Sequence, residues 1–265
     1  MPTLQLFVLA LVQGITEFLP ISSSGHLLLV PLFTGWPDQG LIIDVAVHVG
    51  TLVAVLIYCW RDLLHMMLGL VAAFKGKVTP HFRILGFLLI STIPIVVAGY
   101  FLNKEFTNGI RNLEVLGWAT LLFGIILYIS DKVGMTIRRI EHMTIIDSIL
   151  IGCAQILALI PGTSRAGITI TIARISGFER KDSARFSMLL AIPVILGAGS
   201  LKGWDLYMTG NNAITITALI AGCLAFLSAL TTIWILMLWL KKSSYTPFAV
   251  YRVFLGILLL AISYS

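Results

Sequence analysis

The sequence predicts an all-α polytopic membrane protein, with six transmembrane helices and two re-entrant helical hairpins arranged as an inverted-topology repeat. Of its 265 residues, 58% are hydrophobic and 11% are charged, and the mean hydropathy is +0.99. Soluble domains have roughly 45–50% apolar and about 25% charged residues. The apolar residues form continuous runs, and two further apolar stretches are interrupted by Pro, Gly and Ser. We therefore expect a single membrane domain over 1–265.

Six continuous apolar runs are each predicted to be a transmembrane helix. Runs of about 20 residues match the thickness of the hydrocarbon core, and continuous rather than alternating apolar sequence favours helices over a barrel. The predicted spans are 41–60, 84–102, 113–130, 186–201, 214–240 and 247–264, of which 186–201 is short. Three cysteines, Cys59, Cys153 and Cys223, fall within apolar segments without metal-type spacing, so we expect buried thiols.

Two apolar stretches are broken in the middle: 4–19 is followed by 25–33, and 145–160 by 166–175. Each second arm has about ten residues, which at about 1.5 Å per residue cannot cross a core about 30 Å thick. Irregular backbone at membrane depth is tolerated only where protein or a water-filled cavity surrounds it. The two stretches are therefore predicted to be re-entrant hairpins that meet at a polar site.

The two halves of the chain, approximately 1–142 and 143–265, resemble each other. A shift of 142 residues places Gln13 on Gln155, Ser22 on Ser164 and Gly25 on Gly167. These matched residues lie in the two broken stretches, at or near the breaks. Because each half contains three predicted spans, the second copy would be inverted in the membrane.

The basic residues predict an orientation. Twelve Lys and Arg fall in the connections 61–83, 131–143, 176–185 and 241–246, whereas the opposite side has only Lys104, Arg111 and Lys202. Connections rich in Lys and Arg stay in the cytoplasm, so both termini should face outward. The first basic residue is Arg61, so no signal peptide is expected and the N-terminus should be retained. Two interpretations of 64–82 stay open: an interfacial amphipathic helix or an ordinary loop.

The net charge of +6 does not indicate a nucleic-acid partner, because no run of Lys and Arg is longer than two residues. The expected partners are membrane lipids and a lipid substrate. A homodimer is one assembly that the sequence leaves open.

The first broken stretch reads Gln-Gly-Ile-Thr-Glu-Phe-Leu-Pro-Ile-Ser-Ser-Ser-Gly-His at 13–26. Ionisable groups such as Glu17 and His26 are costly in a membrane and are functional candidates by default. A capped helix-turn-helix in a soluble core would be the ordinary explanation of this pattern, but the composition argues against it. Asp44 and His48 lie one helical turn apart, so we consider that both face the same cavity; a polar pair near a helix start is the equal alternative.

The second broken stretch reads Pro-Gly-Thr-Ser-Arg-Ala-Gly-Ile-Thr at 161–169. Arg165 at the start of a short helix combines a planar cationic donor with free backbone N–H groups, which suits a phosphate. The competing interpretation is a helix cap with Arg165 snorkelling to the interface. The two stretches are predicted to meet near the bilayer midplane, with Glu17, Ser23 and His26 facing Arg165 across a polar cavity. Together they predict phosphoryl transfer: Arg165 would hold phosphate oxygens, His26 and Glu17 would handle protons or help to hold a divalent metal, and a serine or water would attack.

These two motifs resemble the bacitracin-resistance type of undecaprenyl-diphosphate phosphatase, and the likeness extends along nearly the whole chain. The resemblance implies hydrolysis of undecaprenyl diphosphate to the monophosphate and inorganic phosphate, which recycles the lipid carrier of cell-wall synthesis. It also implies dependence on a divalent cation, Mg²⁺ or Ca²⁺, a place in the bacterial cytoplasmic (inner) membrane, and a site that opens to the outer face.

The same resemblance implies roles for individual residues. The expected catalytic residues are Glu17, Ser23, His26 and Arg165, and the expected substrate-binding residues are Ser22, Ser24, Gly25, Ser164, Gly167 and Thr169. Some members of the family have a glutamate where this chain has Gln13. The expected metal ligands are therefore Glu17 with Gln13 as a neutral oxygen ligand, or Glu17 alone with the substrate phosphates.

Two other classes of protein compete with a phosphatase. A transporter or lipid flippase would use inverted repeats with broken helices and would also need Arg165 for a phosphorylated lipid. Release of phosphate in detergent, where no gradient exists, separates the two. A membrane scaffold without chemistry would leave Glu17, His26 and Arg165 unexplained.

Overall fold

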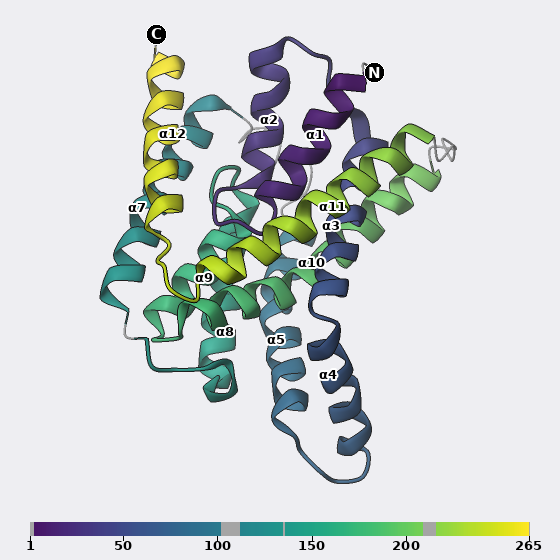
Figure 1. Cartoon of the computed structure of the whole chain (residues 1–265), viewed down its shortest axis with the longest axis vertical. Coiled ribbons are helices and arrows are strands. Elements are labelled where there is room, and N and C mark those ends of the chain that lie inside the picture. Colours follow the sequence, from purple (N-terminus) through teal and green to yellow (C-terminus); the bar gives the residue numbers. More distant parts are fainter. Residues whose placement is uncertain (1–2, 102–111, 135, 209–215, 265) are drawn as a thin grey trace.

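The computed structural model of the chain describes residues 3–101, 112–134, 136–208 and 216–264, which form helices joined by short connections (Figure 1). Within these ranges six helices are long and apolar enough to cross a membrane, which confirms the predicted number of spans. They are α3 (Gly40–Tyr58), α5 (Pro80–Phe101), α7 (Leu113–Val133), α10 (Arg180–Met208), α11 (Ile216–Trp239) and α12 (Thr246–Tyr264). Lys104 and Arg111, which were counted on the outer side, lie outside the described residues.

The shorter helices include the two broken stretches. The first consists of α1 (Thr3–Thr16) and α2 (Ser23–Thr34), and the second of α8 (Ile145–Gln155), the 3-10 turn η2 (Ile156–Leu159) and α9 (Arg165–Ile175). A further 3-10 turn, η1 (Ile140–His142), precedes α8, and α4 (Trp60–Ala73) follows α3 directly. The part of 64–82 up to Ala73 is therefore helical, whereas its place at the membrane interface stays a prediction.

The fourth span is longer than predicted. The sequence suggested 186–201, whereas α10 has 29 residues and begins at Arg180. Charged residues ended the apolar run in the sequence but do not end the helix, because a polar first turn is compatible with helical backbone.

The prediction that all three cysteines are buried is also wrong. Cys59 is buried, but Cys153 and Cys223 are exposed on the surface of the protein. Apolar sequence indicates burial in a soluble protein, but in a membrane helix the apolar side chains also cover the surface that meets lipid.

Both broken stretches turn on a serine in an unusual conformation. Ser22 (φ 76°) and Ser164 (φ 69°) are the non-glycine residues with positive φ in the described ranges, and they are the N-caps of α2 and α9. Each hydroxyl accepts a hydrogen bond from the N–H of the glycine three residues later, at 3.4 Å for Gly25 and 3.0 Å for Gly167. Such backbone costs on the order of 1–3 kcal/mol and persists only where the surroundings impose it. The same local structure therefore recurs at the two positions that the 142-residue shift had matched.

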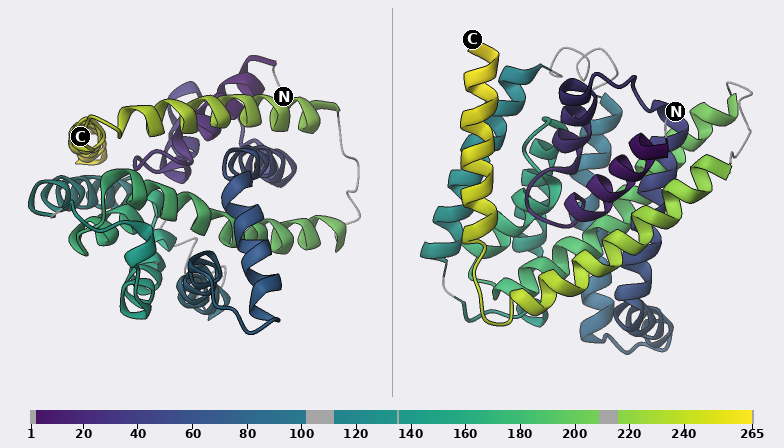
Figure 2. Two further views of the ribbon diagram at one scale, coloured as in Figure 1. Left: turned by 60° about the horizontal axis from the view of Figure 1, so that its bottom comes forward. Right: turned by 45° about the horizontal axis from the view of Figure 1, so that its top comes forward.

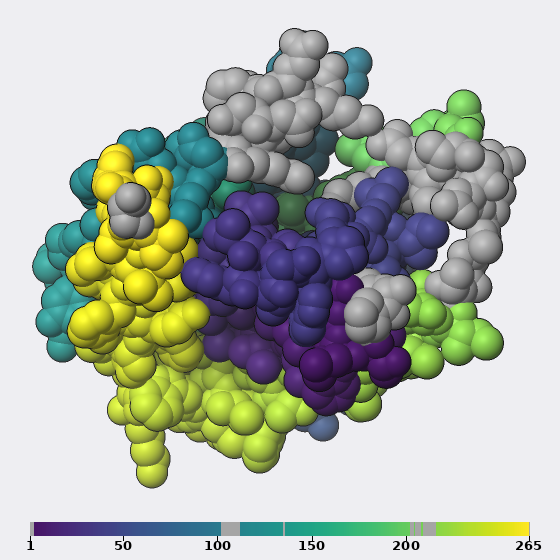
Figure 3. Space-filling view, turned by 90° about the horizontal axis from the view of Figure 1, so that it is seen from above, coloured from purple at the N-terminus to yellow at the C-terminus, as the bar shows by residue number. Residues whose placement is uncertain are grey.

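The helices pack so that the two breaks lie in the interior. α12 lies against α7, α11 crosses α1 and α3, and α5 lies against α8 (Figures 1 and 2). Seen from the end where α1 begins and α12 ends, α2 lies near the centre of the face, with α12 on one side and α1 on the other (Figure 3). The largest apolar core includes residues of α3, α5, α9, α10, α11 and α12. This arrangement brings the loops after α1 and before α9 together.

Candidate active site

Glu17 is the centre of a cluster of polar side chains. Its Oε1 accepts a hydrogen bond from Nη2 of Arg165 at 2.8 Å, and its Oε2 accepts from Oγ of Ser23 at 2.7 Å and from Nε2 of Gln13 at 3.0 Å. Glu17 and Arg165 form an ion pair whose side chains are only 8% and 12% exposed. The prediction that the two broken stretches meet through these residues is confirmed.

The local folding of the first stretch explains how Glu17 reaches Ser23. α1 ends at Thr16, and the N–H of Glu17 donates to the carbonyl of Gln13 at 3.0 Å, so the backbone of Glu17 continues the hydrogen-bond pattern of the helix. The chain then turns through Ser22 and restarts as α2 at Ser23. The end of one helix and the start of the next therefore present a carboxylate and a hydroxyl to each other.

Arg165 is held from the opposite side. It is the first residue of α9, and its Nη1 donates to the carbonyl of Ser187 on α10 at 3.0 Å. The hydroxyl of Thr169, one turn further along α9, lies 2.9 Å from the carbonyl of Arg165 and 2.8 Å from Oγ of Ser187, so it can donate to the carbonyl while it accepts from Ser187. Thr169 therefore positions Arg165 through α10, and it is itself buried at 1% exposure.

The cluster faces a cavity of about 200 Å³. Glu17, Ser23, Arg165 and His48 provide its polar wall, and the remaining wall is largely apolar, with Val45, Ile95, Ala158, Val194, Ile195 and Ala198. A cationic donor, a carboxylate and a hydroxyl therefore converge on a small space within apolar helices, where electrostatic interactions are stronger than in water.

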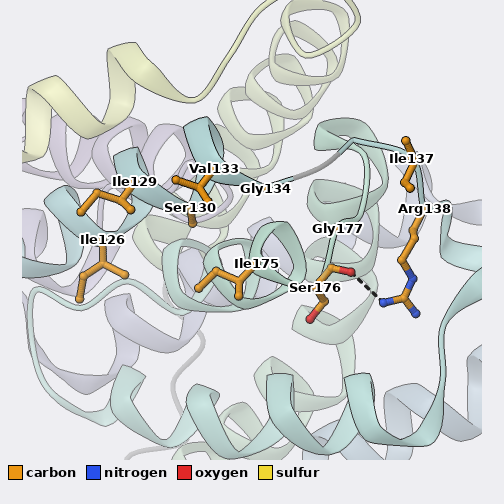
Figure 4. A pocket seen from close by; sticks show the side chains of 10 residues that line it. All are labelled: Ile126, Ile129, Ser130, Val133, Gly134, Ile137, Arg138, Ile175, Ser176 and Gly177. Carbon is orange, nitrogen blue, oxygen red and sulfur yellow. Dashed lines mark hydrogen bonds between the residues drawn. The ribbon is translucent and has the colours of Figure 1, made fainter.

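A larger cavity of about 500 Å³ lies between α7 and the end of α9 (Figure 4). Four isoleucines and one valine make up half of its ten lining residues, and its one charged lining residue is Arg138. The guanidinium of Arg138 is already engaged, with Asp147 at 2.6 Å and with the carbonyl of Ser176 at 2.7 Å. This cavity therefore lacks the acid–base pair that the smaller one has.

His26 does not lie where it was predicted. Instead of facing Arg165, its ring stacks on Tyr251 of α12, with ring centroids 5.7 Å apart. Nδ1 lies 2.7 Å from the carbonyl of Ser22, and Nε2 lies 2.6 Å from the hydroxyl of Tyr251. Because a carbonyl only accepts, we assign the proton to Nδ1, so that Nε2 of the neutral ring accepts from Tyr251. Both ring nitrogens are thus engaged within the protein, and a catalytic role for His26 stays a prediction.

The predicted substrate-binding residues divide into two groups. The hydroxyls of Ser22 and Ser164 and the amides of Gly25 and Gly167 form the two helix caps, so these groups already bond to each other. Ser24 contacts only Oγ of Ser22, at 3.4 Å, among the side-chain bonds of the first stretch. Direct contact of these residues with a substrate stays a prediction.

Only one member of the Asp44 and His48 pair faces the cavity. His48 lines the cavity, and its Nδ1 lies 2.7 Å from the backbone carbonyl of Asp44. The carboxylate of Asp44 instead accepts from Nε2 of Gln39 at 2.9 Å and is not part of the cavity wall. His48 is therefore the member of the pair that joins the site.

The residues around Glu17 offer oxygen donors that suit a hard cation. Oε1 of Gln13 is buried without a hydrogen-bond partner, and Nε2 of the same amide donates to the carboxylate of Glu17, which also accepts from the hydroxyl of Ser23. Mg²⁺ uses one or two carboxylates together with phosphate and water oxygens, so this donor set fits the expected cation. No cluster of three or more His, Cys, Asp or Glu occurs in the described ranges, so phosphate or water oxygens would have to complete the coordination.

Sequence reasoning missed three residues that support the site: Ser187, Tyr251 and Arg252. Ser187 and Tyr251 carry ordinary polar groups in apolar helices, and nothing in the sequence indicates their partners. Arg252 did offer a signal, because an ionisable residue within a predicted span is a functional candidate by default.

Comparisons with known proteins agree on one family. The profile of the family described as "Bacitracin resistance protein BacA" matches residues 6–258. The chain is 49% identical to a Rhodospirillum rubrum protein named undecaprenyl-diphosphatase 1, an alignment that covers 98% of this chain and 95% of the relative. It is 46% identical to an undecaprenyl-diphosphatase of Ruegeria pomeroyi, over the full length of both chains. It is 44% identical to one of Chromohalobacter salexigens, over 98% of each chain.

Proposed function

Since the chain belongs to the bacitracin resistance protein BacA family, we propose that it is a membrane phosphatase that hydrolyses undecaprenyl diphosphate to undecaprenyl phosphate and inorganic phosphate. This reaction recycles the lipid carrier of cell-wall synthesis, and bacitracin resistance follows from the family. The observation that carries the proposal is the contact of Arg165 and Ser23 with the two oxygens of Glu17, at 2.8 and 2.7 Å, beside a cavity within apolar helices.

The geometry favours Ser23 as the nucleophile. Its Oγ donates to Oε2 of Glu17, which is the arrangement of a hydroxyl beside its general base. Glu17 takes the proton of Ser23, Oγ attacks the terminal phosphorus, and the bond from that phosphorus to the bridging oxygen breaks. Undecaprenyl phosphate leaves with the bridging oxygen. Water then hydrolyses the phosphoserine, which yields inorganic phosphate and restores the hydroxyl of Ser23.

Arg165 contributes charge stabilisation in both steps. Its guanidinium is fixed between α10 and the first stretch, so its N–H groups are positioned before substrate arrives. Phosphoryl transfer depends mainly on positioning and on stabilisation of the equatorial oxygens, and a single arginine can contribute on the order of 10³-fold or more. A divalent cation held by Glu17 and Gln13 would neutralise further phosphate charge.

Several features support the finer architecture that we propose, two re-entrant hairpins in an inverted repeat. Oγ of Ser228 on α11 donates to the carbonyl of Leu11 on α1, and Oγ of Ser91 on α5 donates to the carbonyl of Ser148 on α8, at 3.2 and 2.7 Å. In each case the first helix of one broken stretch bonds to the second span of the other half. Two copies related by a two-fold axis would exchange their hairpins in this way.

We further propose that both termini and the site opening face the outer side of the inner membrane. The count of basic residues supports this orientation, and α1 begins at the same end of the molecule at which α12 ends (Figure 1). A Lys241→Cys variant lacking the three native cysteines tests it. An impermeant thiol reagent should label position 241 only after the cells are opened. Light scattering of the detergent-solubilised protein tests the homodimer.

The decisive experiment is phosphate release by the purified protein in detergent, with a polyprenyl diphosphate as substrate. We expect release that a chelator abolishes and Mg²⁺ or Ca²⁺ restores. Because detergent carries no gradient, a carrier without hydrolytic activity would release none, and that result would refute the phosphatase. An acid-stable phosphoserine at position 23 in rapidly quenched samples would identify the nucleophile, whereas its absence would favour direct attack by water.

A further inference from the structure

Arg252 is a buried cation that the proposed reaction does not use. It lies within α12, its exposure is 0%, and no carboxylate forms an ion pair with it in the described residues. Transfer of an isolated charge into a protein interior is very unfavourable unless polar groups compensate it. The position of this side chain therefore requires an explanation in terms of what surrounds it.

Backbone carbonyls surround it. Nη2 donates to the carbonyls of Gly162 and Thr163 at 2.8 and 2.9 Å, and Nη1 donates to the carbonyl of Pro20 at 3.3 Å. Nε donates to the carbonyl of Thr120 on α7, also at 3.3 Å. Pro20 belongs to the loop between Glu17 and Ser23, and Thr163 lies two residues before Arg165. One guanidinium thus bonds to both loops that carry the proposed reacting groups.

The neighbouring backbone leaves room for the side chain of Arg252 only because two residues lack a side chain. A Cβ added at Gly167 would lie 2.6 Å from Nη1 of Arg252, and one added at Gly124 would lie 2.7 Å from its Cβ. Gly167 therefore has a structural reason to be glycine that is separate from any contact with substrate.

The chemistry of arginine suits the binding of several backbone carbonyls at once. Several carbonyl oxygens that point at one another repel, and a planar group with five N–H donors can satisfy them in fixed directions. Lysine has a single ammonium and cannot reach carbonyls on two loops and on α7 at once. Bonds to two loops also fix the distance between those loops, which a contact with one loop would not do.

We propose that Arg252 is a positioning residue that fixes the separation of Glu17 and Arg165 by bonding to the backbone of both loops. It touches neither substrate nor reacting atoms. The kinetic consequence rests on the proposed function, whereas the consequence for loop structure does not. A misplacement of reacting groups by about 1 Å can cost about 100-fold in rate.

The test compares Arg252→Lys with Arg174→Lys. Arg174 is also 0% exposed, but it bonds to Asp131 and to backbone near the end of α9, away from both loops. We measure kcat and KM with a soluble prenyl diphosphate, and hydrogen exchange of the amides in 17–22 and 160–164. Arg252→Lys should lower kcat by about 10- to 100-fold, change KM by less than about threefold, and accelerate exchange in both segments. Arg174→Lys should leave kcat and exchange in these segments unchanged.

The proposal is overturned if folded Arg252→Lys protein exchanges both segments at the wild-type rate, or if Arg174→Lys accelerates them equally. If the wild-type protein releases no phosphate, the proposed function fails and the exchange measurement alone decides the positioning role. If Arg252→Lys does not fold, Gly124→Ala decides by the same readouts, because its methyl group would lie 2.7 Å from Cβ of Arg252 and would displace that side chain. Its control is Gly197→Ala, which has nothing within 4 Å of the added Cβ and should behave as wild type.

Discussion

Replacement of Arg165 by alanine tests both the structure and the chemistry of the site. The change leaves the carboxylate of Glu17, which is 8% exposed, without its cation. Removal of one partner from a buried pair costs about 3–5 kcal/mol of stability. On the reaction, loss of an arginine that stabilises phosphoryl transfer should lower kcat by about 10³-fold, which corresponds to about 4 kcal/mol on the barrier.

Arg165→Lys should have a stability and a kcat between those of the wild-type protein and those of Arg165→Ala. Lysine keeps a charge near Glu17 but cannot also donate to the carbonyl of Ser187, where Nη1 now lies at 3.0 Å. A hydrogen bond from a charged group contributes about 1.5–3 kcal/mol, so we expect part of the stability to return without most of the rate. Arginine and lysine are not equivalent where the guanidinium bonds in two directions.

The assay is steady-state kinetics with a soluble short-chain prenyl diphosphate, together with thermal unfolding in detergent. The matched control is Arg139→Ala, which breaks an exposed ion pair with Glu179 whose side chains are 68% and 39% exposed. Such a pair contributes about 0–1 kcal/mol, so neither stability nor kcat should change measurably. A folded Arg165→Ala protein whose kcat stays within about tenfold of wild type would refute the assignment of Arg165 to the transition state.

Three further predictions concern the neighbours of Glu17 and His26. Ser23→Ala should lower kcat by at least about 10³-fold because it removes the nucleophile, whereas Ser24→Ala, which loses only a contact at 3.4 Å, should stay within about tenfold; equal effects would contradict the role of Ser23. Gln13→Glu should lower the Mg²⁺ concentration that gives half-maximal activity, because it adds a second carboxylate beside Glu17; an unchanged or higher requirement would show that position 13 is no ligand. Tyr251→Phe frees Nε2 of His26, so diethyl pyrocarbonate should modify this histidine faster than in wild type, and an unchanged rate would contradict the assigned hydrogen bond.

The contact between Glu17 and Arg165 could be predicted from sequence, although 148 residues separate them. Each group alone would be an uncompensated charge in a membrane, so the cost of burial itself indicated that they meet. The number of spans followed from the length of apolar runs for a similar reason. Both predictions depend on the free-energy cost of placing charged or polar groups in hydrocarbon, which applies to any fold that the chain adopts.

Other features depend on how particular helices pack, and the sequence does not contain that information locally. His26 was placed with Arg165 because both carry polar chemistry, yet its partner is Tyr251, 225 residues away on α12. The charge of Arg252 is compensated by backbone carbonyls. Because every residue has a carbonyl, the sequence does not indicate which residues are its partners. The burial of Cys153 was mispredicted because hydropathy does not distinguish the surface that meets lipid from the core.

The ion pair between Glu17 and Arg165 also bears on selectivity among the lipids of the membrane. The guanidinium is paired with a carboxylate that the protein itself supplies, so any other anion must compete with Glu17 for Arg165. A phosphodiester head group carries one negative charge on its phosphate, whereas a terminal diphosphate carries more and exposes more oxygens. An internal competitor therefore disfavours the abundant phospholipids more than the diphosphate, because specificity depends on the difference between two affinities. The monophosphate product also carries less charge than the diphosphate, so the return of Glu17 to Arg165 assists its release.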